Sequence, residues 1–221
     1  MGGIPKYILI SLNIPEHLKT KEIKIVYKGL MECVNNYNIS NIGGNITKSE
    51  KLIISITLIG EVLKKNLLLR SSAFAGDYIY TEEGVGKSAK GFYKLINGAK
   101  KIDNDILYHL KPTPSIKWNK LLNKYEINSA IDISDGFIAD LNHILEKSKK
   151  GAEIYIDNIP SDEVENFLYG GEDYKIIFTS PDDIYEKGII KIGKIIKNKK
   201  IYLIKENKKI ILKKIKGFRH F

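Results

Sequence analysis

The stretch from residue 130 to residue 136, Ala-Ile-Asp-Ile-Ser-Asp-Gly, constrains the fold more than any other part of this sequence. Its first four residues are typical of a short buried strand, and residues 137–145 follow with apolar side chains at helical spacing. Asp132 and Asp135 therefore fall between a strand end and a helix start, a common place for a phosphate and its metal. Carboxylate oxygens suit Mg2+. The alternative is a simple helix cap made by Ser134 or Asp135.

Length and cysteine content limit the class of protein. The 221 residues leave room for one or two domains with a real core. The single cysteine, Cys33, excludes an internal disulfide and a cysteine-based zinc site. No run of eighteen apolar residues predicts a membrane span, and the first residues do not resemble a secretion signal. These observations favour a cytoplasmic protein.

The net charge of +10 suggests a nucleic-acid binder at first sight, but its distribution argues against one. Residues 184–221 hold 13 basic and 2 acidic side chains, whereas the rest of the chain is nearly neutral. In this tail lysine alternates with isoleucine, which is typical of strands with one solvated face. Lysine on edge strands also prevents unwanted pairing.

Hydrophobic patterning predicts alternating strands and helices with a domain boundary near residue 65. The first part is expected to contain strands at 7–14 and 52–62, a helix at 19–38 and a flexible glycine loop at 43–47. The second part is expected to contain strands at 76–80, 130–133 and 174–179, helices at 87–97, 103–110, 115–124 and after 136, and three lysine- and isoleucine-rich strands at the C-terminus.

Four further segments accompany the two aspartates. They are the double glycine at 43–47, an arginine-led turn at 70–77, two glycines with two carboxylates at 170–174, and the C-terminal residues 216–221. Each alone is more typical of an ordinary turn or surface. In this order and spacing they resemble the thiamine-monophosphate kinase family, which also has the D-L-x-H found at 140–143 and the His-Leu-Lys-Pro found at 109–112.

This resemblance runs from residue 2 to residue 221 and implies an α/β (α+β) chain of two domains, similar to aminoimidazole ribonucleotide synthetase. Residues 1–65 would be the remainder of an ATP-binding dimerisation domain, and residues 66–221 a larger synthetase-like domain. The family implies direct, in-line transfer of the γ-phosphoryl group of ATP to thiamine monophosphate with Mg2+ and no phosphoenzyme. It also implies a homodimer formed through the N-terminal strands.

The resemblance assigns roles to individual residues and none to a covalent catalyst. The residues expected to contact ATP are Tyr27, Gly44, Asn45, Arg70 and Ser134. Glu172 and Phe218 match positions that contact thiamine monophosphate: the carboxylate by accepting from an amino group and the ring by stacking. Asp132, Asp135 and Asn45 are the expected metal ligands.

Two local departures from the family pattern stand out. Many members have aspartate at position 45, and an asparagine oxygen brings no charge to a metal. The family's Gly-Asp-Ser is Gly86-Lys87-Ser88 here, so residues 84–88 look like a phosphate loop. A true phosphate loop needs a glycine at position 81, which is threonine, and we reject that interpretation.

Met1 matches a segment inside family members, so roughly their first third, with a Gly-Asp-Asp metal motif and a substrate-contacting histidine, is expected to be absent. We therefore expect the chain alone to be inactive as a kinase and to self-associate. Three alternatives remain open at this point: a non-catalytic nucleotide-binding or assembly module, another ATP-dependent enzyme of the superfamily, and a basic nucleic-acid binder.

Overall fold

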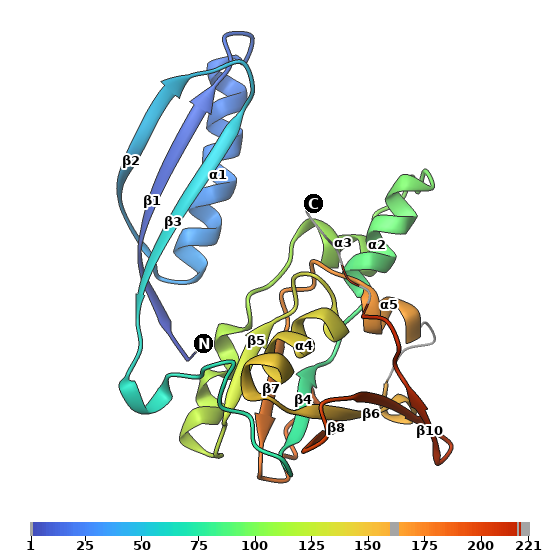
Figure 1. Ribbon diagram of the computed structural model, residues 1–221. Helices are drawn as coiled ribbons and strands as arrows, with labels where there is room; N and C mark the ends of the chain where they lie inside the picture. Colours follow the sequence, from blue (N-terminus) through green and yellow to red (C-terminus); the bar gives the residue numbers. More distant parts are fainter. Residues whose placement is uncertain (1, 160–163, 216, 218–221) are drawn as a thin grey trace. The chain divides into compact units, whose positions relative to one another are not determined.

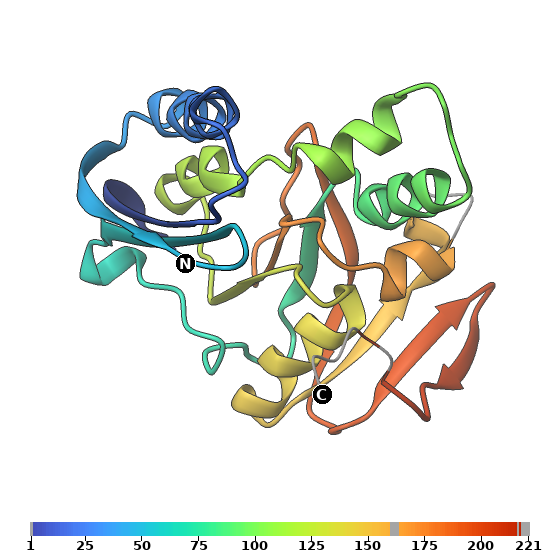
Figure 2. The same ribbon diagram turned by 90° about the horizontal axis from the view of Figure 1, so that it is seen from above.

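A computed structural model describes residues 2–159, 164–215 and 217. The chain divides into two compact units, one over Gly2–Leu67 and the other beginning at Leu68. Figures 1 and 2 trace both units in the colours of the sequence. Within the described residues, no helix combines the length and apolar character needed to cross a membrane.

The N-terminal unit is a three-stranded sheet with one helix along it (Figure 1). Its elements are β1 (Ile4–Ile14), α1 (Thr20–Asn36), β2 (Ser40–Lys48), β3 (Ile53–Glu61) and the short 3-10 helix η1 (Lys64–Asn66). The strand order is β2-β1-β3, with β1 parallel to β2 and antiparallel to β3. Residues Ile8, Ile10 and Leu12 of β1 pack with Val34 of α1 to form the small core.

The expected loop at 43–47 is wrong, because these residues lie inside β2. Gly43 and Gly44 have φ values of 136° and 152°, and Gly44 pairs with Ile10. A Cβ on Gly44 would lie 1.8 Å from the Ile10 carbonyl oxygen. The glycines therefore allow two strands to approach closely. In the sequence alone, two adjacent glycines in a strand look the same as two glycines in a loop.

An apolar row on the edge strand β3 is left uncovered by α1 in the N-terminal unit. The register pairs Ile54, Ile56 and Leu58 with Leu12, Ile10 and Ile8, so all six side chains share one face. The three on β1 are at most 6% exposed, whereas Ile54, Ile56 and Leu58 are 39%, 50% and 56% exposed. An apolar edge of this kind is a candidate association surface.

The C-terminal unit is built on a seven-stranded sheet of order β10-β9-β6-β8-β4-β7-β5, in which only β6 and β9 pair in parallel. Its strands are β4 (Tyr78–Glu82), β5 (Ser129–Asp132), β6 (Gly151–Tyr155), β7 (Ile176–Ser180), β8 (Ile189–Ile196), β9 (Ile201–Lys205) and β10 (Lys208–Ile211). Its helices are α2 (Lys87–Ile96), α3 (Asn104–Leu110), η2 (Ser115–Asn123), α4 (Phe137–Ser148), η3 (Ile156–Asn158) and α5 (Val164–Tyr169).

The predicted strand and helix around the two aspartates are confirmed as β5 and α4. Helix α4 buries Ile138, Leu141 and Ile144 in the main core with Ile131 of β5. The helix expected at 115–124 is instead the 3-10 helix η2. Its buried residues Trp118 and Leu121 are three apart, which suits the three-residue turn of a 3-10 helix. The lysine- and isoleucine-rich strands are confirmed as β8, β9 and β10.

Candidate functional site

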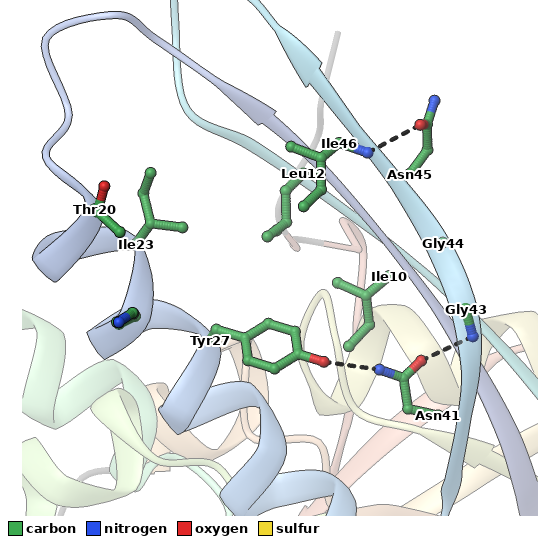
Figure 3. Close-up of a pocket in the computed structure, with 11 residues that line it drawn as sticks. Ile10, Leu12, Thr20, Ile23, Tyr27, Asn41, Gly43, Gly44, Asn45 and Ile46 are labelled. Atoms are coloured by element: carbon green, nitrogen blue, oxygen red, sulfur yellow. Dashed lines mark hydrogen bonds between the residues drawn. The ribbon is translucent and has the colours of Figure 1, made fainter.

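A pocket of about 510 Å³ lies between α1 and the β1–β2 side of the N-terminal sheet (Figure 3). Tyr27 of α1 and Gly44 and Asn45 of the next element, β2, all line it. Its apolar walls are Ile10, Leu12, Ile23 and Ile46. The structure thus brings together the three residues of this unit that we expected at ATP.

Hydrogen bonds fix the polar side chains of this pocket, as Figure 3 shows. The Asn41 amide donates to the Tyr27 hydroxyl at 3.1 Å, and the Asn41 carbonyl oxygen accepts from the Gly43 N–H at 3.1 Å. The side-chain oxygen of Asn45, Oδ1, accepts from the Ile46 N–H at 2.9 Å. A metal bound by Asn45 would therefore have to share or displace that bond.

A second pocket, of about 420 Å³, lies within the C-terminal unit and contains Arg70 and Asp132. Lys147 of α4 also lines it, so two cations and one carboxylate face the same space. The backbone at Arg70 is held in place because its carbonyl accepts the Ser148 hydroxyl at 2.8 Å. A pocket with two cations and a carboxylate suits a phosphate with a metal.

The turn that carries Ser134 and Asp135 is fixed by Asp140 from inside α4. One oxygen of its carboxylate accepts the N–H groups of Ser134, Asp135 and Gly136 at 2.9, 2.9 and 3.2 Å. Asp140 is buried, and this burial raises the pKa of its carboxyl above the ordinary value, while the three N–H groups act in the opposite direction.

This geometry corrects the helix-cap interpretation of the turn. Gly136 is the N-cap residue, and neither Ser134 nor Asp135 caps the helix. The amides of residues 134–136, just before the helix, are already bonded to Asp140. The interpretation of this turn as a phosphate and metal site stays a prediction.

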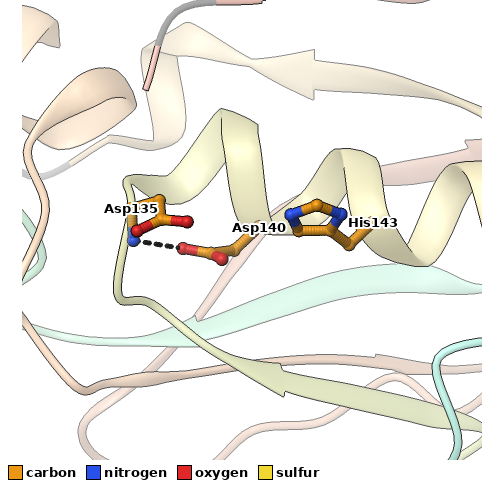
Figure 4. A group of neighbouring side chains, drawn as sticks. All are labelled: Asp135, Asp140 and His143. Carbon is orange, nitrogen blue, oxygen red and sulfur yellow. Dashed lines mark hydrogen bonds between the residues drawn. The ribbon is translucent and has the colours of Figure 1, made fainter. Parts of the chain in front are cut away.

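Asp135, Asp140 and His143 form a cluster whose ligand atoms all lie within 4.8 Å of one another (Figure 4). No other group of three His, Cys, Asp or Glu side chains in the described ranges meets this spacing. The amides occupy one Asp140 oxygen, which leaves the Asp135 carboxylate as the freer ligand. Asp132 does not belong to the cluster.

The two carboxylate-bearing turns of the sequence lie side by side, joined by backbone bonds. Glu172 donates its N–H to the Ser134 carbonyl and Tyr174 donates to Ile133, both at 2.8 Å. Burial raises the pKa of the Tyr174 hydroxyl, and the charges of Glu172, Asp132 and Asp135 raise it further. Three of the predicted site carboxylates therefore lie near enough to the Tyr174 hydroxyl to affect its ionisation.

Asp173 has a role that the sequence did not reveal. Its two oxygens accept the N–H groups of Gly86 and Ser88 at 2.7 and 3.1 Å, at the start of α2. Burial raises its pKa to about 6, although the two amides and Lys175 lower it. The glycine turn at 84–88 is thus occupied by a carboxylate of the chain itself, in agreement with the rejection of a phosphate loop there.

Glu172 and Phe218 are the residues expected at thiamine monophosphate. Glu172 lies in the 170–175 turn with its side chain 63% exposed, and one of its carboxylate oxygens lies 3.7 Å from the Nδ1 atom of His109. Phe218 lies outside the described residues. Four residues at these sites had no role assigned from the sequence: Asp140, Asp173, His109 and Lys147. The only sequence signals for the first three were the motifs that contain them, D-L-x-H for Asp140, Gly-Gly-Glu-Asp-Tyr for Asp173 and His-Leu-Lys-Pro for His109.

Comparison with known proteins agrees with this architecture. A family model described as AIR synthase related protein, N-terminal domain, matches residues 1–62. The thiamine-monophosphate kinase of Aquifex aeolicus (strain VF5) is 32% identical, with 100% of this chain and 76% of that protein covered. The corresponding protein of Buchnera aphidicola subsp. Schizaphis graminum (strain Sg) is 37% identical with the same coverage.

A solved structure of AaThiL complexed with AMPPCP and TMP superposes with a TM-score of 0.88 at 33% identity, covering 100% of this chain and 75% of that one. The chain therefore spans about three quarters of these relatives, somewhat more than the two thirds that we expected from the motifs. Given this identity and coverage, the chain belongs to the thiamine-monophosphate kinase family.

Proposed function

We propose that this protein phosphorylates thiamine monophosphate with ATP to give thiamine diphosphate, by direct in-line transfer assisted by Mg2+. The observation that carries the proposal is the grouping of the expected residues. Tyr27, Gly44 and Asn45 share one pocket, and Arg70 shares another with Asp132. Phosphoryl transfer needs mainly positioning and charge neutralisation, which is what such groups supply.

In this proposal the apolar pocket of the N-terminal unit takes the nucleoside part of ATP, with the Tyr27 ring and hydroxyl at its wall. Gly44 presents backbone instead of a side chain at the pocket wall. The close packing of β2 against the Ile10 backbone already requires glycine at position 44, so the sheet and the ligand require the same residue. Arg70 and Lys147 would neutralise phosphate oxygens, and Ser134 would contact ATP from its turn.

The residues present suit Mg2+ to different degrees. Asp132 offers a carboxylate in the pocket that contains Arg70, and Asp135 offers one in the cluster with Asp140 and His143. One or two carboxylates with substrate phosphates are a usual magnesium set. Asn45 fits less well because its oxygen already accepts a hydrogen bond. When bound, the ion would neutralise charge on the phosphates. Glu172 would accept from the amino group of thiamine monophosphate, and Phe218 would stack on its rings.

The proposal extends to assembly and location. The apolar row Ile54, Ile56 and Leu58 on β3 supports a homodimer formed through the N-terminal strands. A cytoplasmic location agrees with the single, exposed cysteine. A nucleic-acid role is less favoured, because lysines of the basic strands are engaged: Lys191 and Lys209 each lie over a tyrosine ring and contact a carboxylate.

The test measures Mg2+-dependent equilibrium binding of ATP, and separately binding of thiamine monophosphate, for the unaltered chain, Asp132→Asn, Asp135→Asn and the exposed control Asp157→Asn. We expect both site variants to lose Mg2+-dependent ATP binding by more than tenfold and the control to retain it. Unchanged ATP binding in the site variants would contradict the metal assignment. ATP binding without any binding of thiamine monophosphate would favour the non-catalytic nucleotide-binding alternative.

A further inference from the structure

The Glu172 carboxylate is well exposed but lies beside a fixed partner. With a side chain 63% exposed, a glutamate samples several rotamers, and binding must immobilise it. One carboxylate oxygen lies 3.7 Å from His109 Nδ1, at the end of α3. This distance is within ion-pair range and too long for a hydrogen bond, so the imidazole biases the orientation of the carboxylate before any ligand arrives.

His109 is itself held from two sides. Its side chain is 18% exposed, and its Nδ1 atom lies 3.1 Å from the Ser88 hydroxyl. Its ring packs against Phe92 of α2, with the ring centroids 5.4 Å apart. The imidazole therefore cannot turn away from Glu172 without losing a hydrogen bond and a ring contact.

Ser88, the hydrogen-bond partner of His109, is held in place as well, and the contacts form a closed loop. Ser88 is buried, and its N–H donates to Asp173, which is the chain neighbour of Glu172. This loop of contacts runs from Glu172 through Asp173, Ser88 and His109 back to Glu172, and it connects the start of α2, the end of α3 and the 170–175 turn.

We propose that His109 is a positioning residue for the acceptor substrate: seated on Ser88 and Phe92, it orients the Glu172 carboxylate toward an amino-bearing substrate. This inference rests on the proposed function, since it takes Glu172 as a substrate contact. It assigns His109 no contact with ATP. The nitrogen that matters is Nδ1, and an asparagine can place an amide near that position.

Binding measurements test this role. His109→Ala should weaken thiamine monophosphate binding about three- to tenfold, the range for losing the restraint on one flexible side chain, and leave ATP binding unchanged. His109→Asn should restore most of the loss. Leu110→Ala, an exposed neighbour on α3, is the matched control. In a Glu172→Gln background, His109→Ala should add little. Equal weakening of both ligands, or no weakening, overturns the inference.

The pairing also has a readout that does not depend on the substrate. The imidazole 15N resonances of His109 should shift in Glu172→Gln and stay in place in Leu110→Ala. Unshifted His109 resonances in Glu172→Gln would overturn this inference but leave the proposed function standing. If the unaltered chain binds ATP but no thiamine monophosphate, the proposed function fails instead, so the two failures are distinguishable.

Discussion

Two buried aspartates, Asp140 and Asp173, perform similar tasks in different ways. Each holds a glycine turn at the start of a helix by accepting backbone N–H groups. Asp140 belongs to the helix that it fixes and uses one oxygen for three amides. Asp173 reaches α2 from a turn 85 residues away in sequence from Ser88 and uses both oxygens.

The comparison shows how this C-terminal unit differs from a phosphate-binding fold that relies on helix starts. At each helix start a carboxyl of the chain itself accepts backbone N–H groups: those of Gly86 and Ser88 at α2, and those of residues 134–136 just before α4. Asp140 secures a local turn, whereas Asp173 joins distant segments. Their variants should therefore respond differently, and the fluorescence of the single tryptophan, Trp118, reports on this unit.

The largest effects are expected from alanine. Asp140→Ala leaves three amides without an acceptor and should lower the free energy of unfolding by about 3 kcal/mol or more. Asp173→Ala leaves two and should cost about 2 kcal/mol. Urea unfolding at pH 5, with the exposed Glu83→Ala as control, measures both. A smaller loss at position 140 than at position 173 would break the comparison.

Asparagine should separate the sites more sharply. At position 140 its single amide oxygen can accept all three N–H groups, so Asp140→Asn should be tolerated within about 1 kcal/mol. At position 173 the asparagine NH2 group would replace one accepting oxygen, so one of the two N–H groups would lose its acceptor. Asp173→Asn should therefore lower the free energy of unfolding by about 1–2 kcal/mol more than Asp140→Asn does. Both values are taken from urea unfolding at pH 5. Equal losses would mean that the second Asp173 oxygen is unimportant.

The third effect depends on pH. Burial holds the folded-state pKa of Asp173 at about 6, above the ordinary 3.8, so the folded protein binds this proton more tightly than the unfolded chain. That stabilisation is complete below pH 3.8 and is lost as the pH rises through 6. Relative to Asp173→Asn, the unaltered chain should lose about 1.4 kcal/mol between pH 5 and pH 7. A constant difference would contradict the raised pKa.

The smallest effect concerns anions. Removing the carboxylate in Asp173→Ala frees two amides beside Lys87 at a helix start, which is an anion-binding arrangement. Sulfate should then stabilise this variant by about 0.5 kcal/mol more than it stabilises the unaltered chain. Comparing both proteins cancels the general salting effect. If sulfate stabilises both equally, the turn at 84–88 has no latent affinity for anions.

The sequence by itself determined the elements whose signal is local. The strand and helix around Asp132 and Asp135, the lysine-faced C-terminal strands and the two long N-terminal strands follow from periodicity alone. The family also followed from the joint order of short motifs. These inferences succeeded because side-chain periodicity and turn residues act over a few positions.

Only the tertiary structure decided how glycines and carboxylates are used. Gly43 and Gly44 looked like a loop, but their place beside β1 makes them a strand. Asp140 and Asp173 stood in the sequence only as members of short motifs without a role of their own, yet each is buried and bonded to backbone amides. Such roles depend on which backbone groups meet a side chain across long sequence distances, and a local pattern carries no information about that meeting.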